Sequence, residues 1–266
     1  MIRVKSMSKR KRPLQQRMID FYKRKVIDIR KLLYKPIKIK SSDIDSVIDE
    51  FKKKEKIIVL CSGPSAAKVN VSADFLYITT NDSFKLVREL DYLFYLYDPY
   101  YLRQNAFKNI HKKINQPIFF SYFDKRQGQK KSFDYFKNIL HLIKSNNKFI
   151  IDDRFDDLTT RNNYLKFSSF LNHHKIDLKL SNSGIFLLML GYYYSMKMNL
   201  PLEIYGLDLG IGGHIHFDKT KNVTKAITRN SVKVHVREYL DYMYNNHHDI
   251  KNYSNFYGNM TGFKEE

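Results

Sequence analysis

Short apolar runs alternate with helical patterns along most of this chain. The runs predict strands at residues 56–61, 75–80, 92–97, 117–121, 148–151 and 202–206. Several are apolar throughout, as is typical of strands buried on both faces of a sheet. Helical patterns cover about 42–54, 132–145, 184–198 and 232–246. This alternation predicts an α/β domain with a central, mainly parallel sheet and helices on both faces.

The segments between these elements suggest how the domain is organised. The longest apolar stretch, residues 184–196, is too short to span a bilayer and predicts a buried helix. Residues 152–180 and 207–231 are predicted to be irregular and polar, and 207–231 is the candidate lid loop. We therefore expect the folded domain at residues 41–250, followed by a C-terminal tail at 251–266.

Residues 1–40 form a basic extension. Apolar residues recur at helical spacing between 16 and 34, as Met18, Tyr22, Val26, Ile29 and Leu33. This pattern predicts an amphipathic helix, which either lies on an anionic membrane or packs on the domain with a solvated basic face.

The net charge of +20 lies mostly in this extension. Residues 1–40 contain fifteen Lys and Arg against Asp20 and Asp28, which gives +13 and leaves +7 for the other residues. Such a charge predicts an anionic partner: a membrane surface, a nucleic acid or an anionic substrate. The one cysteine, Cys61, excludes an intrachain disulfide and favours a reducing compartment, the cytoplasm.

Polar turn residues follow four of the predicted strands, where ligands of open α/β sheets bind. Ser62, Gly63 and Ser65 follow the first strand, and their hydroxyls and amides could hold a phosphate. Asn81 follows the second strand and Asp98 the third, while Gly206 and Asp208 follow the sixth. Each of these residues is also an ordinary turn former, so none of them alone indicates a site. The prediction of a site depends on their gathering at one edge of the sheet.

Two further motifs complete the candidate site. Asn182, Ser183 and Gly184 precede the apolar helix, whose first amides favour an anion. Candidate general bases are His235, which has Glu238 one helical turn away, and then His216 and His214 in a glycine-rich segment. We expect no metal, although the His-x-His pair and the acidic residues 151–157 leave metal-dependent transfer open.

In order along the chain, these motifs resemble those of the bacterial sialyltransferases of glycosyltransferase family 42, of the lipooligosaccharide type. The family's Gly-Asn-Gly-Pro-Ser turn is similar to residues 61–65 here, and its Tyr-Asn-Pro turn to residues 97–99. The later matches are Asn182-Ser183-Gly184, Gly206-Leu207-Asp208 and His216-Phe217-Asp218. The resemblance covers residues 56–245 and implies a single Rossmann-like domain, a variant of the GT-A fold.

The resemblance implies inverting transfer of sialic acid from CMP-sialic acid to a sugar hydroxyl of a lipid-linked oligosaccharide, with a histidine base and no cofactor. The chain departs from the family at Ser62 and Asp98, where the family has asparagine. The family's catalytic histidine also has no counterpart at the matching offset in this chain. A donor carrying 3-deoxy-manno-octulosonic acid on CMP is therefore an alternative.

The remaining expectations concern partners and location. We expect a peripheral protein on the inner face of the bacterial inner membrane, held through residues 1–40, and a homo-oligomer is possible. We expect no nucleic-acid partner, since the basic cluster is terminal and no common recognition motif is present. A nucleic-acid-binding protein, a phosphoryl-transfer enzyme and a non-catalytic subunit of envelope polysaccharide assembly stay open as alternatives.

Overall fold

The computed structural model of the chain describes Met18 and residues 41–96, 116–120, 148–152, 157–176, 183–209, 217, 230–247 and 249–256. The chain divides into two compact units, Met1–Ile39 and Lys40–Glu266, and every element described below belongs to the second. The predicted helix at 132–145 lies outside the described residues, and so does the predicted helix at 16–34 apart from Met18.

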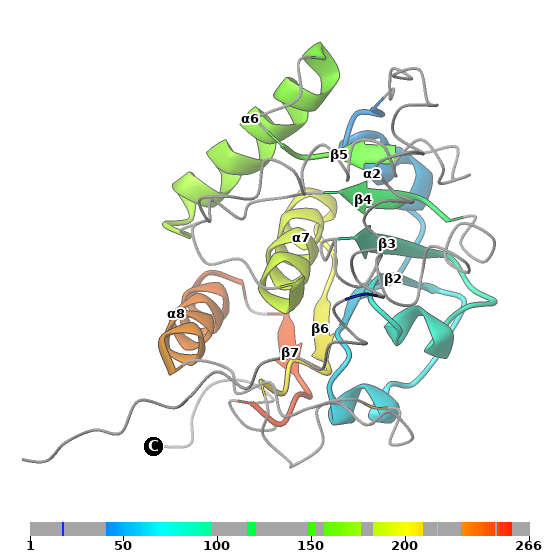
Figure 1. The fold of residues 1–266 in the computed structure, drawn as a ribbon, viewed down its shortest axis with the longest axis vertical. Coiled ribbons are helices and arrows are strands. Elements are labelled where there is room, and N and C mark those ends of the chain that lie inside the picture. Colours follow the sequence, from blue (N-terminus) through cyan, green and yellow to red (C-terminus); the bar gives the residue numbers. More distant parts are fainter. Residues whose placement is uncertain are drawn as a thin grey trace, which may run out of the picture. The chain divides into compact units, whose positions relative to one another are not determined.

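Seven parallel strands form one sheet, in the order β5-β4-β3-β2-β1-β6-β7 (Figure 1). The six predicted strands are confirmed, and the seventh was not predicted. The strands are β1 Lys56–Leu60, β2 Phe75–Thr80, β3 Tyr92–Leu96, β4 Ile118–Phe120, β5 Lys148–Ile150, β6 Leu202–Tyr205 and β7 Ile250–Asn252. The predicted α/β class with a parallel, Rossmann-like sheet is therefore confirmed.

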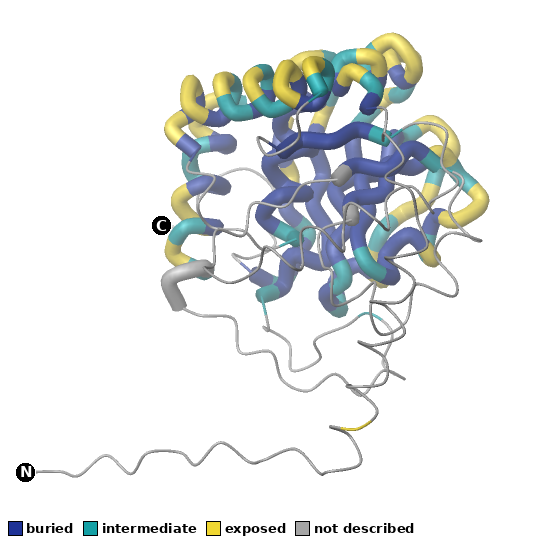
Figure 2. Tube along the Cα trace, turned by 45° about the horizontal axis from the view of Figure 1, so that its top comes forward, coloured by how far each residue is buried: buried dark blue, intermediate teal, exposed yellow. Residues whose placement is uncertain are grey.

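Helix α7, Ser183–Met198, covers the centre of one face of the sheet and is buried over most of its length. Tyr95 of β3 stacks on Phe186 of α7 with ring centroids 4.2 Å apart. Gly191 lies against Val59, where any larger side chain would collide with the valine. Figure 2 shows the strands and α7 buried together, as the apolar run at 184–196 predicts.

The opposite face of the sheet is also buried, since Ile58, Tyr77 and Phe94 alternate along their strands with the residues that pack on α7 and are each 0% exposed. Two short 3-10 helices, η1 Pro64–Lys68 and η2 Ser83–Leu86, follow β1 and β2. Phe84 of η2 packs edge-on against Phe94 and stacks on Tyr92, at centroid distances of 5.7 and 6.1 Å. Burial on both faces explains why the strands are apolar throughout.

The remaining helices are α2 Ser46–Phe51, α6 Leu158–His173 and α8 Asn230–Asn246. Helix α6 corrects the prediction that residues 152–180 are irregular. Its buried stripe is Thr160, Asn163, Phe167 and Leu171, so two of the four inward positions are polar and hide the helical pattern.

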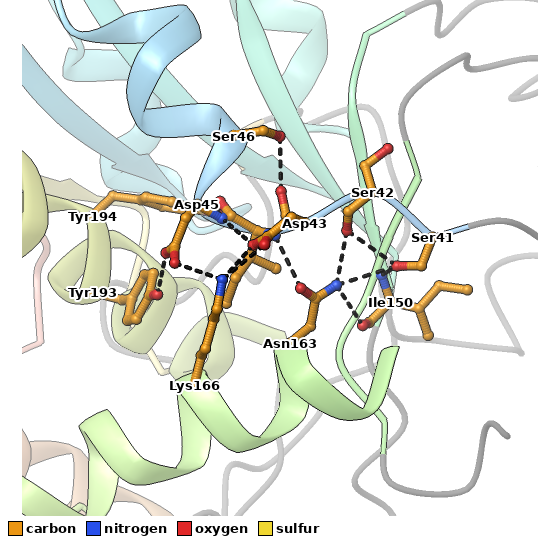
Figure 3. A network of polar contacts seen from close by, with 11 residues as sticks. Ser41, Ser42, Asp43, Asp45, Ser46, Ile150, Asn163, Lys166, Tyr193 and Tyr194 are labelled. Atoms are coloured by element: carbon orange, nitrogen blue, oxygen red, sulfur yellow. Dashed lines mark hydrogen bonds and ion pairs between the residues drawn. The ribbon is translucent and has the colours of Figure 1, made fainter. Parts of the chain in front are cut away.

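Asn163 links α6 to the sheet edge and to the segment before α2 (Figure 3). Its amide donates to the Ser42 and Ile150 carbonyls at 2.8 and 3.2 Å and to the Ser41 hydroxyl at 3.2 Å, while its carbonyl accepts from the Ile44 N–H at 3.0 Å. Four hydrogen bonds thus satisfy a fully buried amide, as burial requires.

An ion-pair cluster lies beside this network. Lys166 of α6 lies 2.7 Å from Asp43 Oδ1 and 2.8 Å from Asp45 Oδ2, and the Tyr193 hydroxyl donates to Asp45 at 2.6 Å. Partial burial opposes ionisation of Asp45, but the hydrogen bonds from Lys166 and Tyr193 outweigh it and lower the pKa of that carboxyl. The cluster fastens α6, α7 and the segment before α2 together.

Candidate functional site

The strand order reverses between β1 and β6, because the chain leaves β1 toward β2–β5 on one side and returns on the other with β6 and β7. In open α/β sheets, the crevice at such a switch point, outside the carboxyl ends of the strands, is the usual ligand site. The turns that follow β1 and β6 carry five of the predicted site residues: Ser62, Gly63, Ser65, Gly206 and Asp208.

These two turns, the β1 turn (residues 62–65) and the β6 turn (206–208), are tied directly to each other. The Ser65 N–H donates to Asp208 Oδ2 at 2.7 Å, and the Ser65 hydroxyl donates to Asp208 Oδ1 at 2.6 Å. That hydroxyl also accepts from the Gly206 N–H at 2.8 Å, and the Gly63 N–H donates to the Gly206 carbonyl at 2.9 Å. Ser65 and Asp208 are each 1% exposed, so both are buried.

This geometry corrects the expectation that the Ser65 amide is free to hold a phosphate. The N–H groups of Gly63 and Ser65 donate to the β6 turn, Ala66 donates to the Gly63 carbonyl, and Pro64 has none. The glycine at 63 is required by Asp208, whose carboxylate would collide with any Cβ there. Of the predicted residues in this turn, Ser62 is the one that is only half-buried, at the turn's start.

The glycine at 206 is likewise required by the close packing of the two turns. Its φ is +74°, a left-handed conformation that disfavours other residues, and a Cβ would meet the Cys61 carbonyl. The two glycines therefore allow the turns after β1 and β6 to touch through their backbones.

The β2 turn (residues 81–83) joins the same edge through a residue that the sequence pattern did not identify. Ser83 is fully buried, and its hydroxyl contacts the Leu60 carbonyl at 2.6 Å and accepts from the Thr80 N–H at 3.0 Å. Asn81, half-buried, has a φ of +54°, which is uncommon outside glycine but tolerated by asparagine. The Ser62 hydroxyl approaches the Thr80 carbonyl at 3.4 Å, so Ser62 lies between the ends of β1 and β2.

The β7 turn (residues 253–256) was assigned to a tail, yet it belongs to the same edge. The Leu207 N–H donates to the Ser254 hydroxyl at 2.9 Å, and the Asn255 N–H donates to Asp208 Oδ1 at 2.5 Å. Asn252 fixes the turn by accepting from the Ser254 N–H and donating to the Phe256 carbonyl, both at 3.0 Å. The folded domain thus extends to at least Phe256, beyond the predicted boundary at 250.

The start of α7 reaches the same edge. The helix begins at Ser183, one residue before the predicted start at 184, and the Gly184 carbonyl lies 4.0 Å from the Cys61 sulfur at the end of β1. Burial and, second, the charge of Asp208 raise the pKa of the Cys61 thiol well above its ordinary value. Cys61 is therefore a packing residue rather than a nucleophile.

Of the candidate bases, His235 lies in the described residues. Its Nδ1 is 3.2 Å from Glu238 Oε2, so the predicted pairing within one turn of α8 is present. Ser195, near the end of α7, contacts Nε2 of His247, which follows α8, at 2.8 Å. The two helices therefore end near each other, at the edge of the sheet opposite to the carboxyl ends of the strands. Because α7 begins at the carboxyl edge, the first half of α8, with His235, lies toward that edge too.

Asp98, Asn182, His214 and His216 lie outside the described residues. Phe217, which follows His216 in sequence, donates its N–H to the Ser62 carbonyl at 2.9 Å. Phe217 is therefore tied to the β1 turn.

Among the described residues, no three His, Cys, Asp or Glu side chains are grouped so that they could hold a metal ion, and none of the helices has the length and apolar character that a membrane span requires. Comparisons with protein-family models, with curated proteins and with solved structures find no match to this chain.

Proposed function

We propose that this protein is an inverting glycosyltransferase that uses a CMP-activated acidic sugar. The observation that carries the proposal is the convergence of the β1, β2 and β6 turns at the switch point of the sheet. These turns come from distant parts of the sequence, and their motifs are the ones that resemble sialyltransferases. The resemblance suggests the reaction and the donor class. The convergence of the three turns supports a single binding site for that donor.

The nucleotide phosphate would lie over the crevice rather than inside the β1 turn. The candidate groups for holding it are the Ser62 hydroxyl after β1, which now donates to the Thr80 carbonyl, the Asn81 side chain after β2 and the first amides of α7 at Ser183 and Gly184. Neutral donors and a helix N-terminus favour a phosphate without adding a cation. The same hydrogen-bond donors would stabilise the negative charge that grows on CMP as the bond from sugar to phosphate breaks.

His235 is the candidate base within the described residues. In this reaction the acceptor hydroxyl attacks the anomeric carbon of the donor sugar, CMP leaves from the opposite face, and the histidine takes the hydroxyl proton. Glu238 beside Nδ1 would fix the ring's orientation and leave Nε2 to receive the proton. A general base of this kind contributes about 10²–10⁴-fold to the rate.

The donor sugar is proposed at the level of its class. Sialic acid follows from the resemblance, and 3-deoxy-manno-octulosonic acid is the second candidate because Ser62 stands where the family has asparagine. Both sugars carry a carboxylate, so the proposal predicts acidic donors and excludes neutral ones.

A transfer assay with and without His235 tests the proposal. CMP release from CMP-sialic acid and from CMP-3-deoxy-manno-octulosonic acid is followed with a lipooligosaccharide acceptor. We expect one donor to turn over and His235→Ala to lower kcat by about 10²-fold or more. His173→Ala, which removes an exposed histidine of α6, is the matched control and should leave turnover unchanged. Full activity of His235→Ala would remove His235 from the mechanism, and turnover of neither donor would refute the function.

A further inference from the structure

We infer that the β7 turn (residues 253–256) is a positioning part of the candidate site, which sets the shape of the β1 turn through the buried Asp208 carboxylate. This inference rests on the proposed function, since it concerns how well that site holds its nucleotide. It adds Ser254 and the Asn255 backbone to the residues on which the site depends.

The carboxylate joins three turns in one place. Among the described residues its donors are the Ser65 N–H, the Ser65 hydroxyl and the Asn255 N–H, at 2.7, 2.6 and 2.5 Å. Hydrogen bonds to an ionised group are shorter and stronger than neutral ones, and a buried carboxylate depends on them because water cannot replace them. Any displacement of Asp208 is therefore passed directly to Ser65.

Ser254 fixes the other end of this linkage. Its hydroxyl accepts from the Leu207 N–H at 2.9 Å, and it is fully buried. Leu207 lies between Gly206, whose carbonyl holds the Gly63 N–H, and Asp208. The β7 turn thus holds the β6 turn at two adjacent residues, and the β6 turn holds the β1 turn at Gly63 and Ser65.

Ser62 is the residue on which this linkage acts. It precedes Gly63 in the chain and is only half-buried at the end of β1, whereas Gly63 and Ser65 have no N–H left for a ligand. The β7 turn consequently determines where the Ser62 hydroxyl lies, without a contact to the nucleotide. A role of this kind predicts altered binding, whereas a purely structural role predicts altered stability alone.

The test compares Ser254→Ala, which removes the acceptor of the Leu207 N–H, with Ser168→Ala. The control removes an exposed hydroxyl of α6 that donates to the Leu165 carbonyl at 3.3 Å. Two quantities are measured in the full chain: amide hydrogen exchange in the peptide covering residues 61–68 without ligand, and the Kd for CMP. Asp208→Asn, of nearly the same shape, replaces Ser254→Ala if the latter does not fold.

We expect Ser254→Ala to speed exchange in residues 61–68 and to weaken CMP binding about tenfold, with kcat nearly unchanged. Ser168→Ala should change neither quantity. A lower melting temperature with unchanged exchange and unchanged Kd would overturn the positioning role. If the wild type binds no CMP, the proposed function fails, and exchange at 61–68 alone decides whether the β7 turn controls the β1 turn.

Discussion

Replacing Gly63 by alanine tests whether the β1 turn is built around Asp208. The backbone at Gly63, with φ −70° and ψ 167°, suits alanine, so the substitution introduces no conformational strain. By itself, the change from glycine to alanine would stabilise the protein by about 0.4–1 kcal/mol through the unfolded chain. The added Cβ, however, would collide with the Asp208 carboxylate and would lie 2.5 Å from the Gly206 carbonyl.

To make room, Asp208 must give up its hydrogen bonds to Ser65, and bonds to a charged group contribute about 1.5–3 kcal/mol each. The loss of two such bonds exceeds the entropic gain, so we expect a net destabilisation of about 2–5.5 kcal/mol. For a domain of this size, that corresponds to a melting temperature lower by about 4–22 °C.

Thermal unfolding of the wild type, Gly63→Ala, Asp208→Ala and the double variant forms a double-mutant cycle. Because the collision with the carboxylate is absent when residue 208 is alanine, Gly63→Ala should cost less in that background. An equal or higher melting temperature for Gly63→Ala would refute the reasoning. Equal costs in both backgrounds would assign the collision to the Gly206 carbonyl alone.

Three further predictions follow from the described contacts and from the charge pattern. Burial and, second, the charge of His173 lower the pKa of His174, so folding favours the neutral ring. The free energy of unfolding should therefore be highest above pH 6.5 and should fall below that pH. In denaturant unfolding measured at several pH values, His174→Gln should flatten this dependence. Asn163→Ala should destabilise the domain by about 3 kcal/mol, since it leaves the buried Ile44 N–H without its acceptor and removes the amide donor from the Ser42 and Ile150 carbonyls, whereas the exposed Asn162→Ala on the same helix should change little in thermal unfolding. Deleting residues 1–40 should weaken sedimentation with anionic vesicles and leave transfer to a soluble acceptor intact; unchanged vesicle binding would reject the membrane anchor.

The sequence predicted the strands well because a parallel sheet buried on both faces leaves continuous apolar runs. It missed β7, Ile250–Asn252, because that strand is short and has a lysine in its centre. It missed α6 because Thr160 and Asn163 occupy inward positions of the helix. A polar residue on a buried face is recognised only when its partners are known, and the partners of Asn163 lie before α2 and in β5.

The candidate site was predicted in its location more than in its contacts. The polar residues after β1, β2 and β6 do gather at one edge, because parallel strands place their carboxyl ends together. The pairing of Ser65 with Asp208, 143 residues apart, has no signature in either motif. Without it, the β1 turn resembles a phosphate loop with free amides, whereas the Gly63 and Ser65 amides donate to the β6 turn.

The most direct test of the proposed CMP-sugar site is calorimetric titration of the full chain with CMP, using UMP as the matched control. The two nucleotides differ only in the base edge, so any preference reports a site that reads cytosine. We predict that CMP binds, that UMP binds at least about tenfold more weakly, and that Ser62→Ala weakens CMP. Equal binding of the two nucleotides, or binding of neither, would contradict a CMP-sugar site at the carboxyl ends of β1 and β6.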